Sequence, residues 1–81
     1  MSTLTIMPDP VAQNVVFSEY AVCFELADGR SISAPLEWFP RLRDATPEQR
    51  ANWEPIGRGS GIHWPDVDED ISIAGLMGLP D

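Results

Sequence analysis

The 81-residue sequence contains no lysine, one cysteine (Cys23) and one histidine (His63). The absence of lysine excludes Schiff-base chemistry and a P-loop phosphate site, since both need that amine. A lone cysteine cannot form a disulfide within the chain, and a lone histidine leaves a zinc site short of ligands. No cofactor and no metal are therefore expected.

Long apolar segments are also missing. No apolar run approaches the roughly 20 residues that a membrane-spanning helix needs. The N-terminus has neither the basic region nor the apolar region of a signal peptide. Together with the unpaired Cys23, these features predict a cytoplasmic protein that makes no membrane contact.

Positive charge is scarce. Five arginines face thirteen acidic residues, which gives a net charge of −8. Such a chain repels the phosphates of nucleic acids and anionic membranes, so direct nucleic-acid binding is not expected. The charge favours a basic protein partner or a mimic of nucleic acid, although solubility alone would produce the same balance. Because arginine pairs well with carboxylates, some Arg–carboxylate pairs are expected inside the fold.

The length is that of one domain with a thin core. Residues 1–10 form an N-terminal arm that ends in Pro8 and Pro10, and residues 11–81 form a single domain. Eight prolines and six glycines predict short elements joined by many turns.

The first half of the domain has the pattern of antiparallel strands. A β-like segment covers 11–17, and apolar residues then alternate with others from Tyr20 to Leu26. Asp28-Gly29 predicts a tight turn, and residues 30–34 return as the partner strand. The sequence therefore predicts an N-terminal hairpin or meander.

Helical signals follow. Leu36, Phe39 and Leu42 are three apart and predict a short helix within 36–45, while a capping box at 46–49 starts a second helix that reaches about residue 53. Residues 62–64 are predicted as a short strand, 65–70 as a loop, and Ser72 as the cap of a last helical turn. The predicted fold class is α+β, a small antiparallel sheet with two to three short helices packed on one face.

The segment 61–73 combines acidic and aliphatic residues. It cannot be wholly buried, because unpaired carboxylates stay in water. We expect a rim whose acidic side contacts a partner through Asp66, Asp68, Glu69 and Asp70. All three tryptophans are expected to be mostly core, and Trp64 is expected to show most surface and to act as an anchor for a basic partner.

The sequence gives little support for a catalytic site or a metal site. Asp66, Asp68 and Asp70 have the spacing of a calcium loop, but Ile71 and Met77 stand where its glycine and glutamate belong. His63 with a nearby carboxylate lacks a zinc ligand set, and is expected to bond a carboxylate or the backbone. The glycine-rich segment 57–61 lacks the P-loop lysine, so a mobile turn is expected there. A Cys23–His63 nucleophile stays open, but a small core side chain is the expected role of Cys23, and the protein is not expected to be an enzyme.

Several motifs occur together in one order: Asp28-Gly29-Arg30, then P-L-E-W-F-P-R-L at 35–42, A-T-P-E-Q-R at 45–50, and I-H-W-P-D-V-D-E-D-I-S-I at 62–73. In this combination the chain resembles DUF2442, a small bacterial and phage family of unknown function, from about residue 15 to residue 77. The resemblance implies an α+β fold, no established activity and no catalytic residue. Members resemble one half of small two-gene modules with a supposed antitoxin-like role. The helix-turn-helix that some relatives carry is not present here.

The leading hypothesis is a non-catalytic, antitoxin-like partner of a small basic protein in a two-gene module. The alternative is a phage-type acidic inhibitor that mimics nucleic acid and acts on a CRISPR or restriction complex, and an uncharacterised enzyme comes third. The composition is also compatible with a homodimer.

Overall fold

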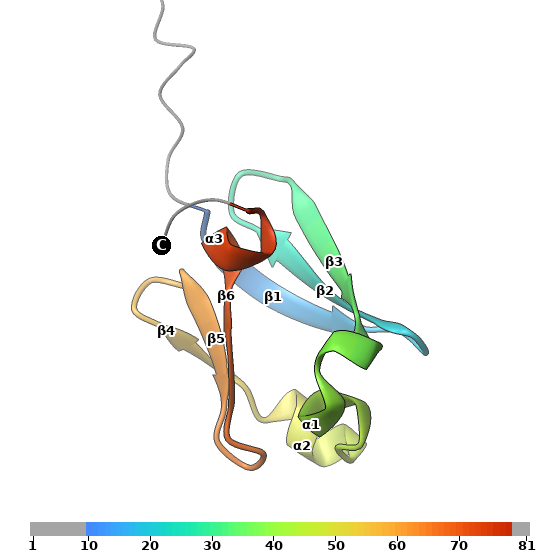
Figure 1. Ribbon diagram of the computed structural model, residues 1–81. Coiled ribbons are helices and arrows are strands. Elements are labelled where there is room, and N and C mark those ends of the chain that lie inside the picture. Colours follow the sequence, from blue (N-terminus) through green and yellow to red (C-terminus); the bar gives the residue numbers. More distant parts are fainter. Residues whose placement is uncertain (1–9, 79–81) are drawn as a thin grey trace, which may run out of the picture.

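The computed structural model of the protein describes residues 10–78, which form two three-stranded antiparallel sheets and four short helical segments (Figure 1). The predicted arm at 1–10 thus lies almost wholly outside the described residues. The first sheet has the order β1-β2-β3 and the second β4-β5-β6. Their strands are β1 Ala12–Phe17, β2 Ala21–Leu26, β3 Ser31–Pro35, β4 Glu54–Ile56, β5 Gly61–Trp64 and β6 Glu69–Ser72.

The helical segments lie at the two ends of the sheets. A 3-10 helix, η2, covers Leu36–Trp38 and is followed by α1 at Pro40–Arg43 and α2 at Pro47–Ala51. In Figure 1, α1 and α2 lie together at one end, whereas α3 at Ile73–Leu76 lies towards the other. The coarse α+β prediction is confirmed, but one sheet with all helices on one face is not what forms.

The first sheet follows its alternating sequence. Val22, Phe24 and Leu26 of β2 are buried, because every second residue of a strand points to the same side. Gly29 has a φ of 94°, so the predicted Asp-Gly turn joins β2 to β3. Cys23 points to the opposite side from Val22 and Phe24 and is only half-buried, so its expected place in the core is wrong.

The predicted helix at 36–45 is interrupted. Phe39 has φ −131° and ψ 76°, which are not helical values, and α1 begins afresh at Pro40. Proline has no N–H to continue the preceding turn but suits the first position of a new helix. The capping box of α2 is confirmed, with Gln49 N donating to Thr46 Oγ1 at 3.1 Å and Thr46 N donating to Gln49 Oε1 at 3.0 Å.

The second sheet is the main feature that the sequence did not predict. Of its strands only β5 was expected, and the loop predicted at 65–70 is instead a turn that leads into β6. All three residues of β4 are exposed and one is Pro55, which an edge strand tolerates. Only Ile71 is buried in β6, so neither strand has a clear apolar alternation.

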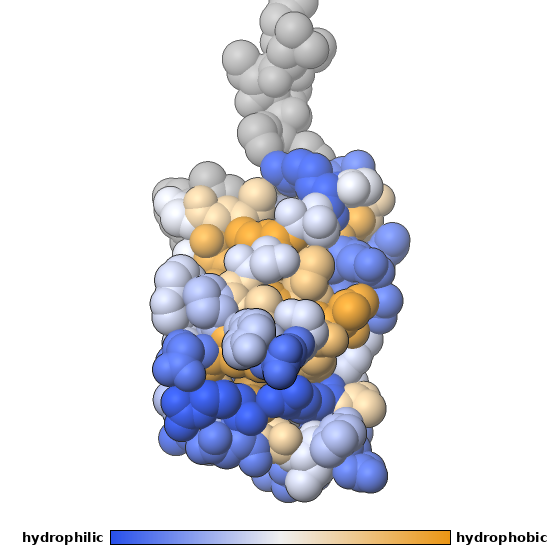
Figure 2. Space-filling model, turned by 90° about the vertical axis from the view of Figure 1, so that its right-hand side faces the viewer, coloured by the Kyte–Doolittle hydropathy of each residue, from blue (hydrophilic) through white to orange (hydrophobic). Residues whose placement is uncertain are grey.

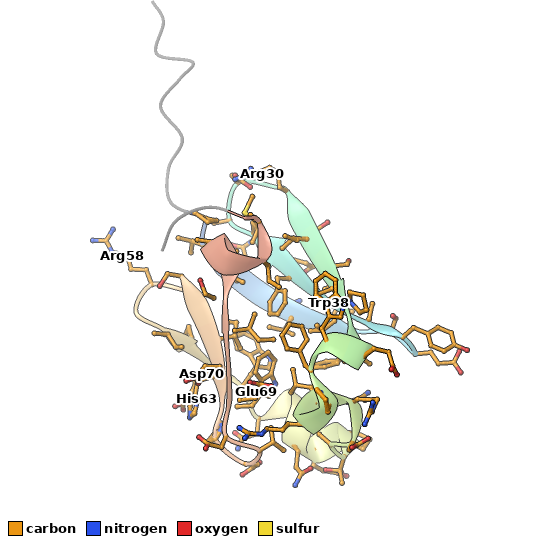
Figure 3. The ribbon with its side chains drawn as sticks, in the orientation of Figure 1. Arg30, Trp38, Arg58, His63, Glu69 and Asp70 are labelled. Atoms are coloured by element: carbon orange, nitrogen blue, oxygen red, sulfur yellow. The ribbon has the colours of Figure 1, made fainter. Side chains whose placement is uncertain are left out.

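Trp64 lies in the centre of the core. Its side chain is 0% exposed, and its ring meets Phe17 and Phe24 edge-on, at centroid distances of 6.2 and 6.4 Å. The expectation that Trp64 shows a face is therefore wrong. Trp38, the last residue of η2 and labelled in Figure 3, was expected to be core but is 65% exposed. Trp53 is half-buried against the core.

Candidate binding surface

The carboxylates of Asp66, Asp68, Glu69 and Asp70, here called the acidic turn, gather where β5 passes into β6. Trp64 pairs with Glu69 across the two strands, which leaves residues 65–68 as the turn itself. Asp68 has a φ of 53°, a left-handed conformation that aspartate adopts more readily than most residues. The turn thus directs several carboxylates away from the core that Trp64 fills.

Three contacts hold the acidic turn in place. Arg41 of α1 donates from Nη1 to the backbone oxygen of Asp68 at 2.6 Å. Val67, in the same turn, packs against the core. Asn52 adds a hydrogen bond from Nδ2 to Asp66 Oδ2 at 3.0 Å. The carboxylates therefore stand on a positioned backbone.

The arginines do not neutralise this surface. Within residues 10–78, the arginine ion pairs join Arg30 to Asp28 and Arg43 to Asp44 and Glu37. Arg41 reaches the acidic turn but bonds its backbone, not a carboxylate. Asp66, Asp68 and Asp70 are exposed and Glu69 is half-buried, so the predicted rim does form, although its carboxylates differ in exposure.

His63 is the one described cationic side chain that pairs with a carboxylate of this surface. Its Nδ1 bonds Asp70 Oδ1 across β5 and β6 (Figure 3), as expected from the sequence. This hydrogen bond raises the pKa of His63 above its ordinary value of 6.5, although partial burial of the ring works in the opposite direction. Glu54, which pairs with His63 from β4, raises the pKa further.

The structure separates the residues that a nucleophilic site would need. Cys23 lies on the outer side of the first sheet and His63 on the outer side of the second, because the neighbours of each are core residues. The core between the sheets therefore keeps the thiol from the imidazole. Among residues 10–78, no group of three or more His, Cys, Asp or Glu side chains could hold a metal ion.

The glycine-rich segment is a packed turn between β4 and β5. Gly59 N donates to Ile56 O at 3.0 Å, and Gly59 O accepts from Ala12 N at 2.8 Å. A Cβ at Gly59 would lie 2.4 Å from the Ala12 backbone oxygen. The segment thus joins the second sheet to β1.

Exposed aromatic residues occur where the sequence did not predict them. Tyr20 is 75% exposed and Trp38 65% exposed. Both had a signal in the sequence, since Tyr20 follows a turn and Trp38 lies off the face defined by Leu36, Phe39 and Leu42. Figure 2 shows the right-hand side of Figure 1, where apolar side chains gather across the middle between hydrophilic ones above and below.

Together, the fold and surface define a small α+β protein of two antiparallel sheets with an acidic turn. The chain belongs to the family described as "Protein of unknown function (DUF2442)", whose model matches residues 12–79. A crystal structure of a protein of unknown function from Rhodospirillum rubrum ATCC 11170 is similar, with a TM-score of 0.72 and 29% identity over 89% of this chain and 90% of that chain. No curated protein matches the sequence. Within residues 10–78, none of the helices has the length and hydropathy of a membrane-spanning segment.

Proposed function

We propose that this protein is a non-catalytic binding protein whose acidic turn binds arginine and lysine side chains of a small basic protein. One observation carries the proposal: within residues 10–78, no carboxylate of the acidic turn forms an ion pair with arginine. Asp70 pairs with His63 and Asp66 accepts a hydrogen bond from Asn52, but both side chains stay exposed beside Asp68, so the turn keeps negative charge that an external cation can reach.

The support beneath the acidic turn favours binding. Arg41 and Val67 hold the turn before any partner arrives, so association loses little backbone freedom there. A group of like charges also steers an oppositely charged partner and raises the association rate. Trp64 is buried beneath the turn. It therefore supports the turn from the core and does not touch the partner.

The finer proposal is an antitoxin-like role in a two-gene module in the cytoplasm. Its support is the small size and the net charge of −8. A nucleic-acid mimic that inhibits a large complex is the alternative, and the identity of the captured partner separates the two.

The test is capture from the native host with three tagged proteins. These are the parent, Asp68→Asn with Glu69→Gln, and a control, Glu19→Gln with Glu25→Gln, that removes one charge from the turn between β1 and β2 and one from β2. We expect the parent and the control to retain a small basic protein, and the acidic-turn variant to bind it about tenfold more weakly, the effect of roughly 1.4 kcal/mol. Equal binding by all three proteins would overturn the proposal, and capture of a large nucleic-acid-binding complex would favour the alternative.

A further inference from the structure

A groove of about 330 Å³ lies between β1 and α2. Its volume is at the lower end of the range for ligand pockets, about 300–1,000 Å³, which suits one or two side chains better than a whole cofactor. The walls are mostly apolar and carry a single charged group. The lining residues are Val15, Phe17, Pro47, Arg50, Ala51 and Trp53.

The groove runs beside an open edge of the first sheet. The strand order places β1 at this edge (Figure 1). Ser18 N donates to Ala21 O at 2.9 Å, so the backbone of Ser18 faces β2. Because these groups alternate along an antiparallel strand, the N–H groups of Val15 and Phe17 point away from β2.

Only the start of this edge is closed. There, Ala12 N donates to Gly59 O in the turn between β4 and β5. Further along, no backbone group in residues 10–78 accepts from the N–H of Val15 or Phe17. The side chains of the same two residues line the groove. A strand added at this edge would therefore point every second side chain towards the groove.

Arg50 supplies the charge. Its guanidinium carbon lies 5.0 Å from the centre of the Phe17 ring. Nε donates to Leu42 O at 3.0 Å and Nη2 to Arg43 O at 2.9 Å, which uses two of the five N–H groups of the guanidinium. Unlike Arg30 and Arg43, Arg50 has no carboxylate partner among the described residues. An apolar groove thus contains a cation that lacks a counter-charge.

We infer that the edge of β1 and this groove bind an extended peptide segment of a partner protein. The segment adds a strand to the first sheet through the backbone of Val15 and Phe17, places an apolar side chain in the groove and pairs an Asp or Glu side chain with Arg50. In strand addition, backbone hydrogen bonds supply affinity and side-chain pockets supply specificity. This site uses no residue of the acidic turn and does not depend on the function proposed above.

Selection of random peptides displayed on phage tests the inference. The full chain is the target, and each peptide is joined to the coat protein at its carboxyl end, so any carboxylate selected is a side chain. We expect enriched sequences that combine an apolar residue with Asp or Glu. Their binding should fall at least about tenfold in Arg50→Gln, which removes a charge-assisted bond.

A second variant keeps the test valid if Arg50→Gln unfolds the protein. Ala51 is exposed and lines the groove, so Ala51→Glu places a carboxylate beside the guanidinium and should also weaken binding about tenfold. Ser33→Glu, at an exposed position on the opposite edge strand β3, is the matched control and should bind like the parent.

Amide hydrogen exchange gives a readout specific to strand addition. Bound peptide should slow exchange at Val15 and Phe17 but leave Val16, which already faces β2, unchanged. Failure to enrich any peptide, equal binding to Ala51→Glu, or protection that avoids Val15 and Phe17 would each overturn the inference.

Discussion

At the scale of single residues, His63 lies in a row of titratable groups on the second sheet. Glu54 and Asp70 are its register partners on either side. The hydrogen bond to Asp70 is the largest cause of the raised pKa of His63, and the charges of Glu54 and Asp68 act in the same direction. The ionic state of this imidazole therefore reports on the carboxylates around it.

NMR titration of the imidazole should give a midpoint above 6.5, and Asp70→Asn should lower it. A pKa raised by folding means that the pair stabilises the fold fully below the unfolded-state pKa, about 6.5, and that this contribution is lost as pH rises through the folded-state pKa. The stability difference between the parent and Asp70→Asn should shrink over that window. Asp66→Asn serves as the control, and an unchanged midpoint in Asp70→Asn would refute the assignment.

At the scale of elements, substitutions in two turns test which contacts stabilise the sheets. Gly29 and Gly59 have φ values of 94° and 109°, but a Cβ at Gly29 meets no atom within 4 Å, whereas one at Gly59 lies 2.4 Å from Ala12 O. Gly29→Ala should cost about 1–2 kcal/mol for the left-handed backbone alone. Gly59→Ala should cost about 1–3 kcal/mol more, because the turn must separate from β1.

Urea unfolding of both variants gives the two free energies directly. Gly59→Ala and Gly29→Ala with the same loss of stability would show that the turn between β4 and β5 does not support β1. The more drastic Gly29→Val should destabilise beyond Gly29→Ala, because a β-branched side chain tolerates positive φ least.

The elements differ in how far the sequence predicted them. Strands β1 to β3 and the cap of α2 were predictable because alternation, an Asp-Gly turn and a capping box are all local signals. Strands β4 and β6 were not, since β4 is fully exposed with Pro55 at its centre and β6 buries only Ile71. The acidic turn followed from composition. The groove did not follow from the sequence, because it needs contact between β1 and α2, which lie at least 30 residues apart in the chain.

At the scale of the molecule, Trp64 joins the two sheets and the helical segments. Its ring contacts Phe17 and Phe24 of the first sheet, and its Nε1 donates to the backbone oxygen of Arg50 in α2 at 3.0 Å. Trp64→Phe removes that donor and leaves a cavity, so unfolding should lose about 2–4 kcal/mol. For a small domain this is a large share of the total stability.

Trp38→Phe is the matched control, because Trp38 is 65% exposed and the change should stay within about 0.5 kcal/mol. Denaturant unfolding measures both. A Trp64→Phe protein as stable as the Trp38→Phe protein would contradict a core role for Trp64.

The proposed role of the acidic turn is to bind a basic partner, not to support the fold. The most direct measurement is the association rate of the basic partner with the parent and with the Asp68→Asn, Glu69→Gln protein at increasing salt. Screening acts over about 8–10 Å, so the parent rate should fall as salt rises. The variant should associate more slowly, depend less on salt and keep its unfolding free energy within about 0.5 kcal/mol. Equal rates and equal salt dependence, or a variant that unfolds, would contradict a binding role for the acidic turn.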